Sequence, residues 1–399
     1  MKSHFPISII CVIILSSCIE EYHLSNNVVL TSPDIVIQGH IISGNKSVFF
    51  LSQTQPLGSD QKIESVLNAE ITIIGQNGFQ SDAAKYDIEN DFYIINTEDL
   101  PSNTLYAIKV NVENEVYQSE FQALMKTPEI TDITYKERED GISIHVTTYG
   151  DENSSPYYLW AYEEDWEYHA QVDIAGVKGF PIYSSKYYPD GFKNGINPYY
   201  YCWKHNNSKI INLYNTEVLD ENSAKEIEFL RIPIDDCRIS FIYSILLKQY
   251  SLSKEAFQYY SLMKLYTQES SGLFTPMPTE VKGNVTCTSN PSKRVQGYVL
   301  ASDCKTKRMF IYESDFKQIR SKYDGGCYSE KARAGEMLRW EMRIWNEGAV
   351  GVNSYMPELQ PLLNPQYMDT WFFSRECIDC RAVDGATKKR PDFWPNDHE

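Results

Sequence analysis

Hydrophobic and polar residues alternate in short runs along much of this chain, and a period of two is the pattern of β-strands. In residues 105–112 the apolar positions are Tyr106, Ile108, Val110 and Val112, which predicts a half-buried antiparallel strand. Further β runs, separated by polar turns, cover residues 35–42, 48–52, 69–74 and 92–95. Strands at this spacing, with no helical period among them, predict a β-sandwich of roughly 100 residues.

A break in this pattern at Pro128 divides the chain into two predicted units. Proline has no amide N–H for a β-ladder and biases the residue before it towards an extended conformation. We therefore expect an amino-terminal β-sandwich over residues 18–127 and a larger β domain over residues 128–399. A chain of this length exceeds the size at which a single core stops growing, which also favours two domains.

One helix is expected within the β pattern of the second unit, near residues 253–270. Ser253 is a suitable N-cap, apolar residues such as Ala256 and Tyr259 recur on one face, and Gly272 follows as a stop signal. The aromatic stripe on this helix is interpreted as a packing face, with a ligand platform as the alternative.

Beyond the helix, two β runs at residues 281–287 and 295–301 predict a hairpin with a turn between them. Residues 309–312 predict a further strand. The carboxyl-terminal segment 391–395 is polar and aromatic, and we expect it to dock onto the domain.

The first residues have the order of a lipoprotein signal peptide. Lys2 precedes an apolar stretch over residues 5–15, which is shorter than the roughly 20 residues that span a bilayer. Small residues then lead to Cys18, so we expect residues 1–17 to be cleaved and Cys18 to carry the lipid anchor. The alternative is an ordinary secreted protein with an incidental cysteine at this position.

Glu20 and Glu21 lie two and three residues after Cys18, the expected lipidated cysteine. Paired acids at this place resemble the export signal of surface lipoproteins of Bacteroidetes. We expect an outer-membrane anchor that faces outward, with a periplasm-facing anchor as the alternative.

The net charge of the chain is -17, with 54 acidic residues against 37 basic ones. Such a surface repels nucleic-acid phosphates and anionic lipid, so a nucleic-acid partner is not expected. Aromatic residues make up 13% of the chain, which excludes disorder for most of it.

Apart from Cys11 and Cys18, the cysteines all lie in the second half of the chain. Since an exported protein enters an oxidising environment, we expect these cysteines to form disulfides. They are Cys202, Cys237, Cys287, Cys304, Cys327, Cys377 and Cys380. Spacing suggests three pairings, which are Cys202 with Cys237, Cys287 with Cys304, and Cys327 with Cys377 or Cys380.

The Cys377-x-x-Cys380 pair is also compatible with half a zinc site or a redox pair. A structural zinc needs four ligands, and the sequence has no second close pair of cysteines. We interpret both cysteines as disulfide partners.

Tyrosine and tryptophan gather between residues 157 and 203, and residues 172–203 have no period and predict a long loop. Rigid amphipathic rings are enriched where proteins meet their partners. The candidate ligand-facing residues are Trp166, Tyr168, Tyr199, Tyr200 and Trp203. The alternative is that alternate rings, such as Trp160 with Tyr158 or Tyr162, belong to the core.

No catalytic motif stands out in the sequence. It has no G-x-S-x-G nucleophile elbow, no phosphate loop and no histidine pair at helical metal spacing. The acidic runs 163–165 and 235–236 are interpreted as solvated surface, with the paired carboxylates of a hydrolase as the alternative. No catalytic residue, metal or cofactor is predicted.

Several short motifs occur together in an order that resembles domain-of-unknown-function family 4249, the surface lipoproteins of Bacteroidetes. They are IVIQG at 35–39, AFQYY at 256–260, SGLFTPMP at 271–278, GNV at 283–285, VQGYV at 295–299, CIDCR at 377–381 and KRPDFW at 389–394. The resemblance implies an amino-terminal immunoglobulin-like or transthyretin-like sandwich followed by a larger β domain. It also implies a partner, a TonB-dependent outer-membrane receptor, and a part in nutrient import.

We therefore expect a non-enzymatic, lipid-anchored binding or accessory protein of a TonB-dependent import system. A secreted hydrolase acting on glycan or peptide is one alternative. An adhesin or scaffold lipoprotein is the other.

Overall fold

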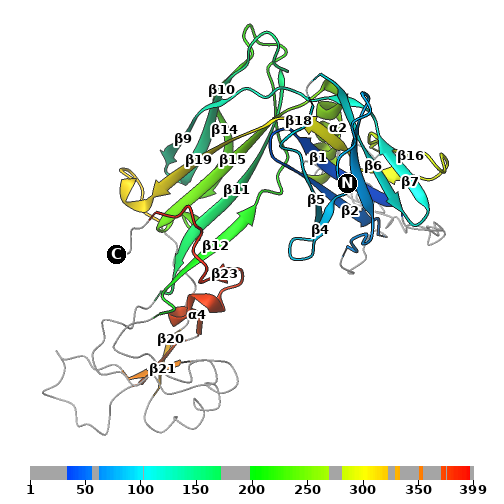
Figure 1. The fold of residues 1–399 in the computed structure, drawn as a ribbon. Coiled ribbons are helices and arrows are strands. Elements are labelled where there is room, and N and C mark those ends of the chain that lie inside the picture. Colours follow the sequence, from blue (N-terminus) through cyan, green and yellow to red (C-terminus); the bar gives the residue numbers. More distant parts are fainter. Residues whose placement is uncertain are drawn as a thin grey trace, which may run out of the picture.

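The computed structural model describes residues 34–55, 63–101, 103–171, 198–268, 281–321, 329–332, 350–353, 370–373 and 375–395. Most of its elements are strands, which confirms the mainly β fold class. They form two sandwiches that lie side by side (Figure 1). The expected signal peptide and Cys18 lie outside the described residues. Within these residues, no helix has the length and hydropathy needed to cross a membrane.

The first sandwich packs two sheets face to face. One sheet contains β1 (Ile35–Ile42), β2 (Lys46–Gln53), β4 (Lys85–Asp87), β5 (Phe92–Asn96), β17 (Val295–Gln296) and β18 (Val299–Ser302). The other contains β3 (Glu70–Gly75), β6 (Leu105–Val112), β7 (Glu115–Ser119), β8 (Gln122–Ala123) and β16 (Val285–Cys287). The amino-terminal β runs predicted from alternation are therefore confirmed.

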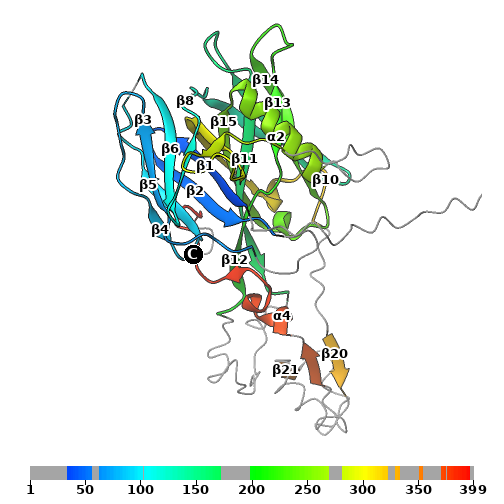
Figure 2. The same cartoon turned by 90° about the vertical axis from the view of Figure 1, so that its right-hand side faces the viewer.

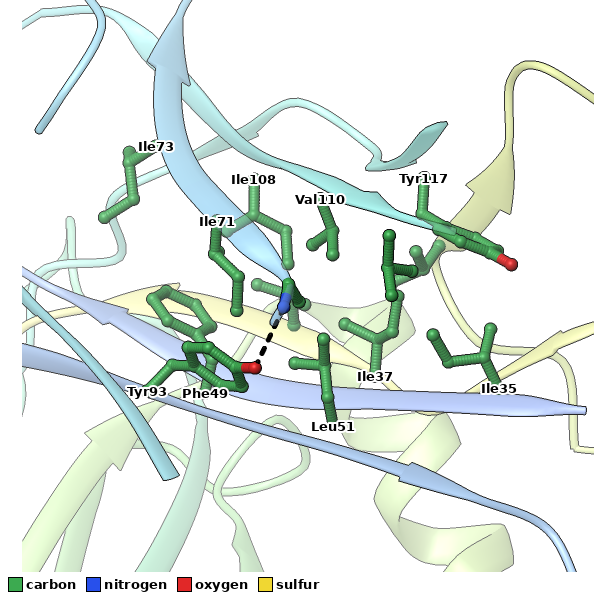
Figure 3. Packing of buried hydrophobic residues seen from close by; sticks show 14 of the residues in the cluster. Ile35, Ile37, Phe49, Leu51, Ile71, Ile73, Tyr93, Ile108, Val110 and Tyr117 are labelled. Carbon is green, nitrogen blue, oxygen red and sulfur yellow. Dashed lines mark hydrogen bonds between the residues drawn. The ribbon is translucent and has the colours of Figure 1, made fainter. Parts of the chain in front are cut away.

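The core of this sandwich is apolar because alternate residues of each strand point inward. Ile37, Phe49, Ile71 and Ile108 are fully buried (Figure 3). The hydroxyl of Tyr93 has two partners at the edge of this core, since it accepts the Ala69 N–H at 3.1 Å (dashed in Figure 3) and donates to the Val66 carbonyl at 2.8 Å. A buried tyrosine is stable only when its hydroxyl has such partners.

Residues 285–302 also belong to the first sandwich, which corrects the predicted domain division and the predicted hairpin. Strand β16 pairs antiparallel with β7, whereas β17 and β18 pair parallel with β1. The two runs thus enter opposite sheets instead of pairing with each other. The physical reason is that residues 34–127 leave the edges of β1 and β7 open, and the returning chain supplies a hydrogen-bond partner for each.

The second sandwich is built from the remaining strands. Its smaller sheet contains β9 (Ile130–Arg138), β10 (Gly141–Tyr149) and β14 (Ser223–Pro233). Its larger sheet contains β11 (Tyr157–His169), β12 (Tyr201–Asn207), β13 (Asn212–Asn215), β15 (Ile242–Ser251), β19 (Cys304–Tyr312) and β23 (Ala386–Thr387). The strand predicted at 309–312 is confirmed as the end of β19.

The remaining described elements are short. Strands β20 (Ser329–Ala332), β21 (Val350–Asn353) and β22 (Thr370–Phe373) form a separate small sheet. The short helical elements are η3 (Cys237–Ile239), η4 (Glu313–Asp315), α4 (Arg375–Ile378) and η7 (Cys380–Ala382).

Helix α2 (Lys254–Thr267) confirms the predicted helix and lies beside β11 and β15 (Figure 2). Ser253 is its N-cap, because the hydroxyl accepts the Ala256 N–H at 3.1 Å. The aromatic stripe is a packing face, as expected. Tyr259 packs against Tyr298 from the first sandwich, with ring centroids 4.8 Å apart, so the helix joins the two sandwiches.

Candidate functional site

Strand β11 separates two kinds of side chain on its two faces. Its even-numbered residues Tyr158, Trp160 and Tyr162 are buried in the core of the second sandwich, as the alternative interpretation of the aromatic cluster stated. From Glu163 onward, its odd-numbered residues point to the opposite face of the sheet. We call this set of residues the β11 face, and it consists of Glu163, Asp165, Glu167, His169, His205, Phe241, Lys248, Arg308, Phe310 and Phe393. Asp165 and Glu167 are buried within it.

Each acid of the β11 face contacts a basic partner. Glu163 pairs with Lys248, and Glu167 pairs with His169. These pairs hold long polar side chains in fixed positions along one strand.

Asp165 is shared between two bases on neighbouring strands. Its Oδ1 accepts a hydrogen bond from His205 Nδ1 at 2.8 Å, and its Oδ2 lies 3.4 Å from Arg308 Nη1. The hydrogen bond to Asp165 raises the pKa of His205, against an opposing effect of burial. The side chain of His205 is 49% exposed, so this imidazole also meets solvent.

Aromatic rings border this row of charges. The ring of Phe241 stacks on His169 at a centroid distance of 3.4 Å, and the Arg308 guanidinium lies 3.5 Å from the centroid of Phe393. Phe241 is 37% exposed and Phe393 is 42% exposed. Charged groups with exposed rings beside them form a surface that can bind a polar ligand or another protein.

The acidic runs discussed as hydrolase carboxylates are also engaged in ion pairs and hydrogen bonds. Glu164 points into the sandwich, where Arg238 Nη1 and the Tyr243 hydroxyl donate to its Oε1 at 2.7 and 2.6 Å. Arg238 also binds both carboxylate oxygens of Asp236. This network stabilises a buried charge, because an unpaired carboxylate inside a sandwich is strongly destabilising.

Three of the five candidate ligand-facing aromatics are buried, so their assignment is wrong. Trp166 stands at an even position of β11 and is buried in the core of the second sandwich, whereas Tyr168 is buried beside Cys202 and Cys380. Trp203 lies on the opposite side of the sheet, but Trp394 from the carboxyl-terminal tail covers it. Alternation along β11 carries the signal for Trp166, whereas the residues that cover Tyr168 and Trp203 come from segments far away in sequence.

The other two candidates, Tyr199 and Tyr200, are half-buried at the end of the β11 face. The Arg381 guanidinium lies 3.4 Å from the centroid of the Tyr199 ring. Tyr200 packs against His169, with centroids 5.1 Å apart. Tyr200 therefore lies beside the β11 face, whereas Tyr199 packs against Arg381 of the carboxyl-terminal segment.

The carboxyl-terminal tail completes this region, and its predicted docking is confirmed. Trp394 is buried, and its Nε1 donates to Glu167 Oε2 at 3.4 Å. Arg390 closes the tail on itself by donating to the carbonyls of Trp394 and Pro395 at 2.8 and 2.7 Å. The sequence pattern places Phe310 in a strand and Phe393 in the docking tail, but it does not indicate that these two rings and Arg308 share one site.

A disulfide between Cys202 and Cys380 links β12 to the segment that leads into the carboxyl-terminal tail. The expected pairing of Cys202 with Cys237 is therefore wrong, and so is that of Cys380 with Cys327. Cys377 is also disulfide-bonded, and the expected bond of Cys327 lies outside the described residues. Cys377 and Cys380 are thus both disulfide partners, as we interpreted them from the sequence in preference to a zinc site or a redox pair.

The expected pairing of Cys287 with Cys304 is wrong as well, because both are free thiols, as is Cys237. The predicted hairpin would have brought Cys287 and Cys304 together. Instead β16 and β19 belong to different sandwiches, which keeps the two cysteines apart.

Two sandwiches, a joining helix and a disulfide-linked tail define this molecule as a mainly β protein with discontinuous sandwiches. The chain belongs to the family described as a domain of unknown function (DUF4249), whose model matches residues 20–308. The resemblance seen in the sequence motifs is thereby confirmed. No curated protein matches this chain.

Two solved structures match this chain weakly. A two-domain fibronectin type-III segment of chicken tenascin is 10% identical, covers 55% of this chain and 90% of its own, and has a TM-score of 0.16. Salmonella alpha-2-macroglobulin reacted with methylamine is 9% identical, covers 76% of this chain and 15% of its own, and has a TM-score of 0.18. TM-scores this low carry no argument about function.

Proposed function

We propose that this chain is a non-enzymatic, outer-membrane lipoprotein that faces the cell exterior and serves as a binding or accessory component of a TonB-dependent nutrient import system. The lipid on Cys18 holds it at the membrane, and the β11 face binds the ligand or the receptor. Two or more acyl chains give stable anchoring, whereas a single chain binds reversibly.

The observation that supports a binding role most is the combination of rigidity and exposure on the β11 face. His205 and Phe393 are each more than a third exposed, yet Asp165 and Arg308 hold them in place. A surface that is ordered before binding loses little conformational entropy on association. The carboxylates of this face are engaged by Lys248, His169, His205 and Arg308, which suits recognition better than general acid–base work.

Mild detergent extraction followed by affinity purification of the full chain tests this proposal. We expect an outer-membrane receptor to co-purify, and the double variant His205→Ala with Phe393→Ala to lose it. Lys225→Gln is the matched control, because Lys225 lies on β14 and pairs with Glu221 away from the β11 face. Recovery of no membrane protein, or equal recovery with the double variant, would contradict the proposal.

Intact mass analysis of the mature amino terminus tests the anchor separately. We expect residue 18 to be the first residue and to carry acyl chains. An unmodified Cys18 or an uncleaved signal would overturn the proposed localisation.

A further inference from the structure

A pocket of about 350 Å³ opens on the first sandwich between β16 and β17, away from the β11 face. Its charged lining residues are Lys282 and Lys293, and its apolar lining residues include Val285, Pro291 and Val295. The volume falls at the lower end of the roughly 300 to 1,000 Å³ found for small-molecule sites. The pocket therefore suits a small organic molecule.

The electrostatic character of this pocket is opposite to that of the whole chain. No acidic residue occurs between Val281 and Ser302, although the chain carries a net charge of -17. Within the described part of the chain, Lys282 is exposed and no carboxylate pairs with it. A local cation in an acidic protein attracts anions that the rest of the surface repels.

The second lysine of the pocket is held in place from behind. Lys293 Nζ lies 3.7 Å from Glu115 Oε1 and 5.8 Å from the centroid of the Tyr117 ring. These groups keep the ammonium protonated, since the hydrogen bond with Tyr117 and the nearby charge of Glu115 both raise the pKa of Lys293. The side chain is still 31% exposed, so its charge remains available to a ligand.

The thiol of Cys287 at this pocket is engaged by its surroundings. Its Sγ donates to Glu115 Oε2 at 3.1 Å, and the same oxygen accepts from the Ser289 hydroxyl at 2.6 Å. The Cys287 side chain therefore forms part of the pocket wall, and its hydrogen bond with Glu115 fixes its position.

We infer that this pocket binds a small organic molecule through its anionic group, with the anion between Lys282 and Lys293 and the carbon skeleton against Val285 and Val295. The anionic group is a carboxylate or a phosphate, both of which a lysine ammonium binds as a point charge. This site is independent of the proposed role of the β11 face, because it lies on the other sandwich.

Ligand-observed NMR with the full chain in detergent tests this inference with three probes, namely succinate, phenyl phosphate and the neutral benzyl alcohol. We expect one or both anions to bind. Their affinity should fall as the salt concentration is raised, since salt screens exposed charges. Succinate binding alone assigns a carboxylate, and phenyl phosphate binding alone assigns a phosphate. Equal binding of benzyl alcohol, or no binding of either anion, would overturn the inference.

Two lysine variants locate the binding. Lys282→Gln and Lys293→Gln should each lower the affinity for the anion by about threefold to tenfold, as expected for one lost charged contact. Lys225→Gln removes the same charge far from the pocket and should bind as the parent does. Because Lys282 is exposed, Lys282→Gln should fold even if Lys293→Gln does not. An unchanged affinity in Lys282→Gln would refute the site.

Discussion

The side chain of Asn284 pairs with the backbone of Val299 in the manner of a neighbouring β-strand. Its Nδ2 donates to the Val299 carbonyl and its Oδ1 accepts the Val299 N–H, both at 2.8 Å. Asn284 is 3% exposed and Val299 is fully buried. The residue thus connects the GNV and VQGYV segments, which enter the two sheets of the first sandwich.

Replacing Asn284 by Ala should lower the free energy of unfolding by about 1 to 3 kcal/mol, because it leaves buried hydrogen-bonding groups of Val299 without this partner. Chemical denaturation of the variant measures the loss. Asn153→Ala, in an exposed turn, is the matched control and should leave the stability within about 0.5 kcal/mol. An equal effect in both variants would show that the paired amide contributes nothing.

Gly297 should tolerate no side chain. Its φ is +102°, and a Cβ at this position would lie 2.1 Å from the Ile37 carbonyl oxygen. Gly297→Ala should therefore cost more than about 2 kcal/mol, since backbone strain and a steric clash add. Gly44→Ala separates the two effects, because Gly44 also has a positive φ (+76°) but no atom lies within 4 Å of its added Cβ. Thermal melts that show equal losses would contradict the steric argument.

His40 should make the protein less stable as the pH falls. It packs against Tyr250 at the junction of the two sandwiches, with ring centroids 4.8 Å apart. Burial, assisted by the positive charge of Lys248, lowers its pKa from 6.5 to about 4. Between these values the unfolded chain binds a proton that the folded chain does not, so about 3 kcal/mol of stability is lost as the pH falls from 6.5 to 4.

Unfolding free energies of the parent and of His40→Phe across this pH range measure the effect. Phe keeps a ring against Tyr250 and does not titrate, so the difference between the two proteins should grow as the pH falls. His205 provides a control of opposite sign, because Asp165 raises its pKa. Its stabilising contribution is present below pH 6.5 and lost as the pH rises through its folded pKa. A parent and a Phe variant with parallel profiles would rule out titration of His40.

The Cys202–Cys380 disulfide should hold the carboxyl-terminal tail against β12. It joins residues 178 positions apart, so its loss should cost about 2 to 5 kcal/mol. Cys380→Ser should also expose Trp394 and make the tail sensitive to limited proteolysis. Cys237→Ser should change neither property, because Cys237 is a free thiol. Peptide mapping that recovers Cys202 bonded to Cys237 would contradict this connectivity.

Local sequence patterns predicted the amino-terminal strands, the end of β19 and the helix correctly, but they placed the first residues of β12, Tyr201 to Trp203, in a loop. Alternation of Tyr106, Ile108 and Val110 placed β6, and Ser253 placed the start of α2. These features depend on residues within a few positions of one another, because side-chain period and helix capping are local properties. The family was also recognisable from the order of short motifs.

The candidate site was only partly predictable. Tyr200 lies beside the β11 face, but Trp166 points inward according to an alternation that the sequence already displayed. Tyr168 is buried beside Cys380, which no local pattern reports. Arg308 joins Asp165 from a strand more than 100 residues later, which no local pattern reports.

By itself, the sequence determined which segments extend as strands, where the helix begins and which residue is expected to carry the lipid. Tertiary structure alone decided that residues 285–302 complete the first sandwich, that Cys202 bonds to Cys380, and that Trp394 covers Trp203. The reason is physical. Strand formation follows from the side chains within one segment, whereas strand pairing, disulfide partners and burial depend on which distant segments satisfy each other's open edges and apolar faces.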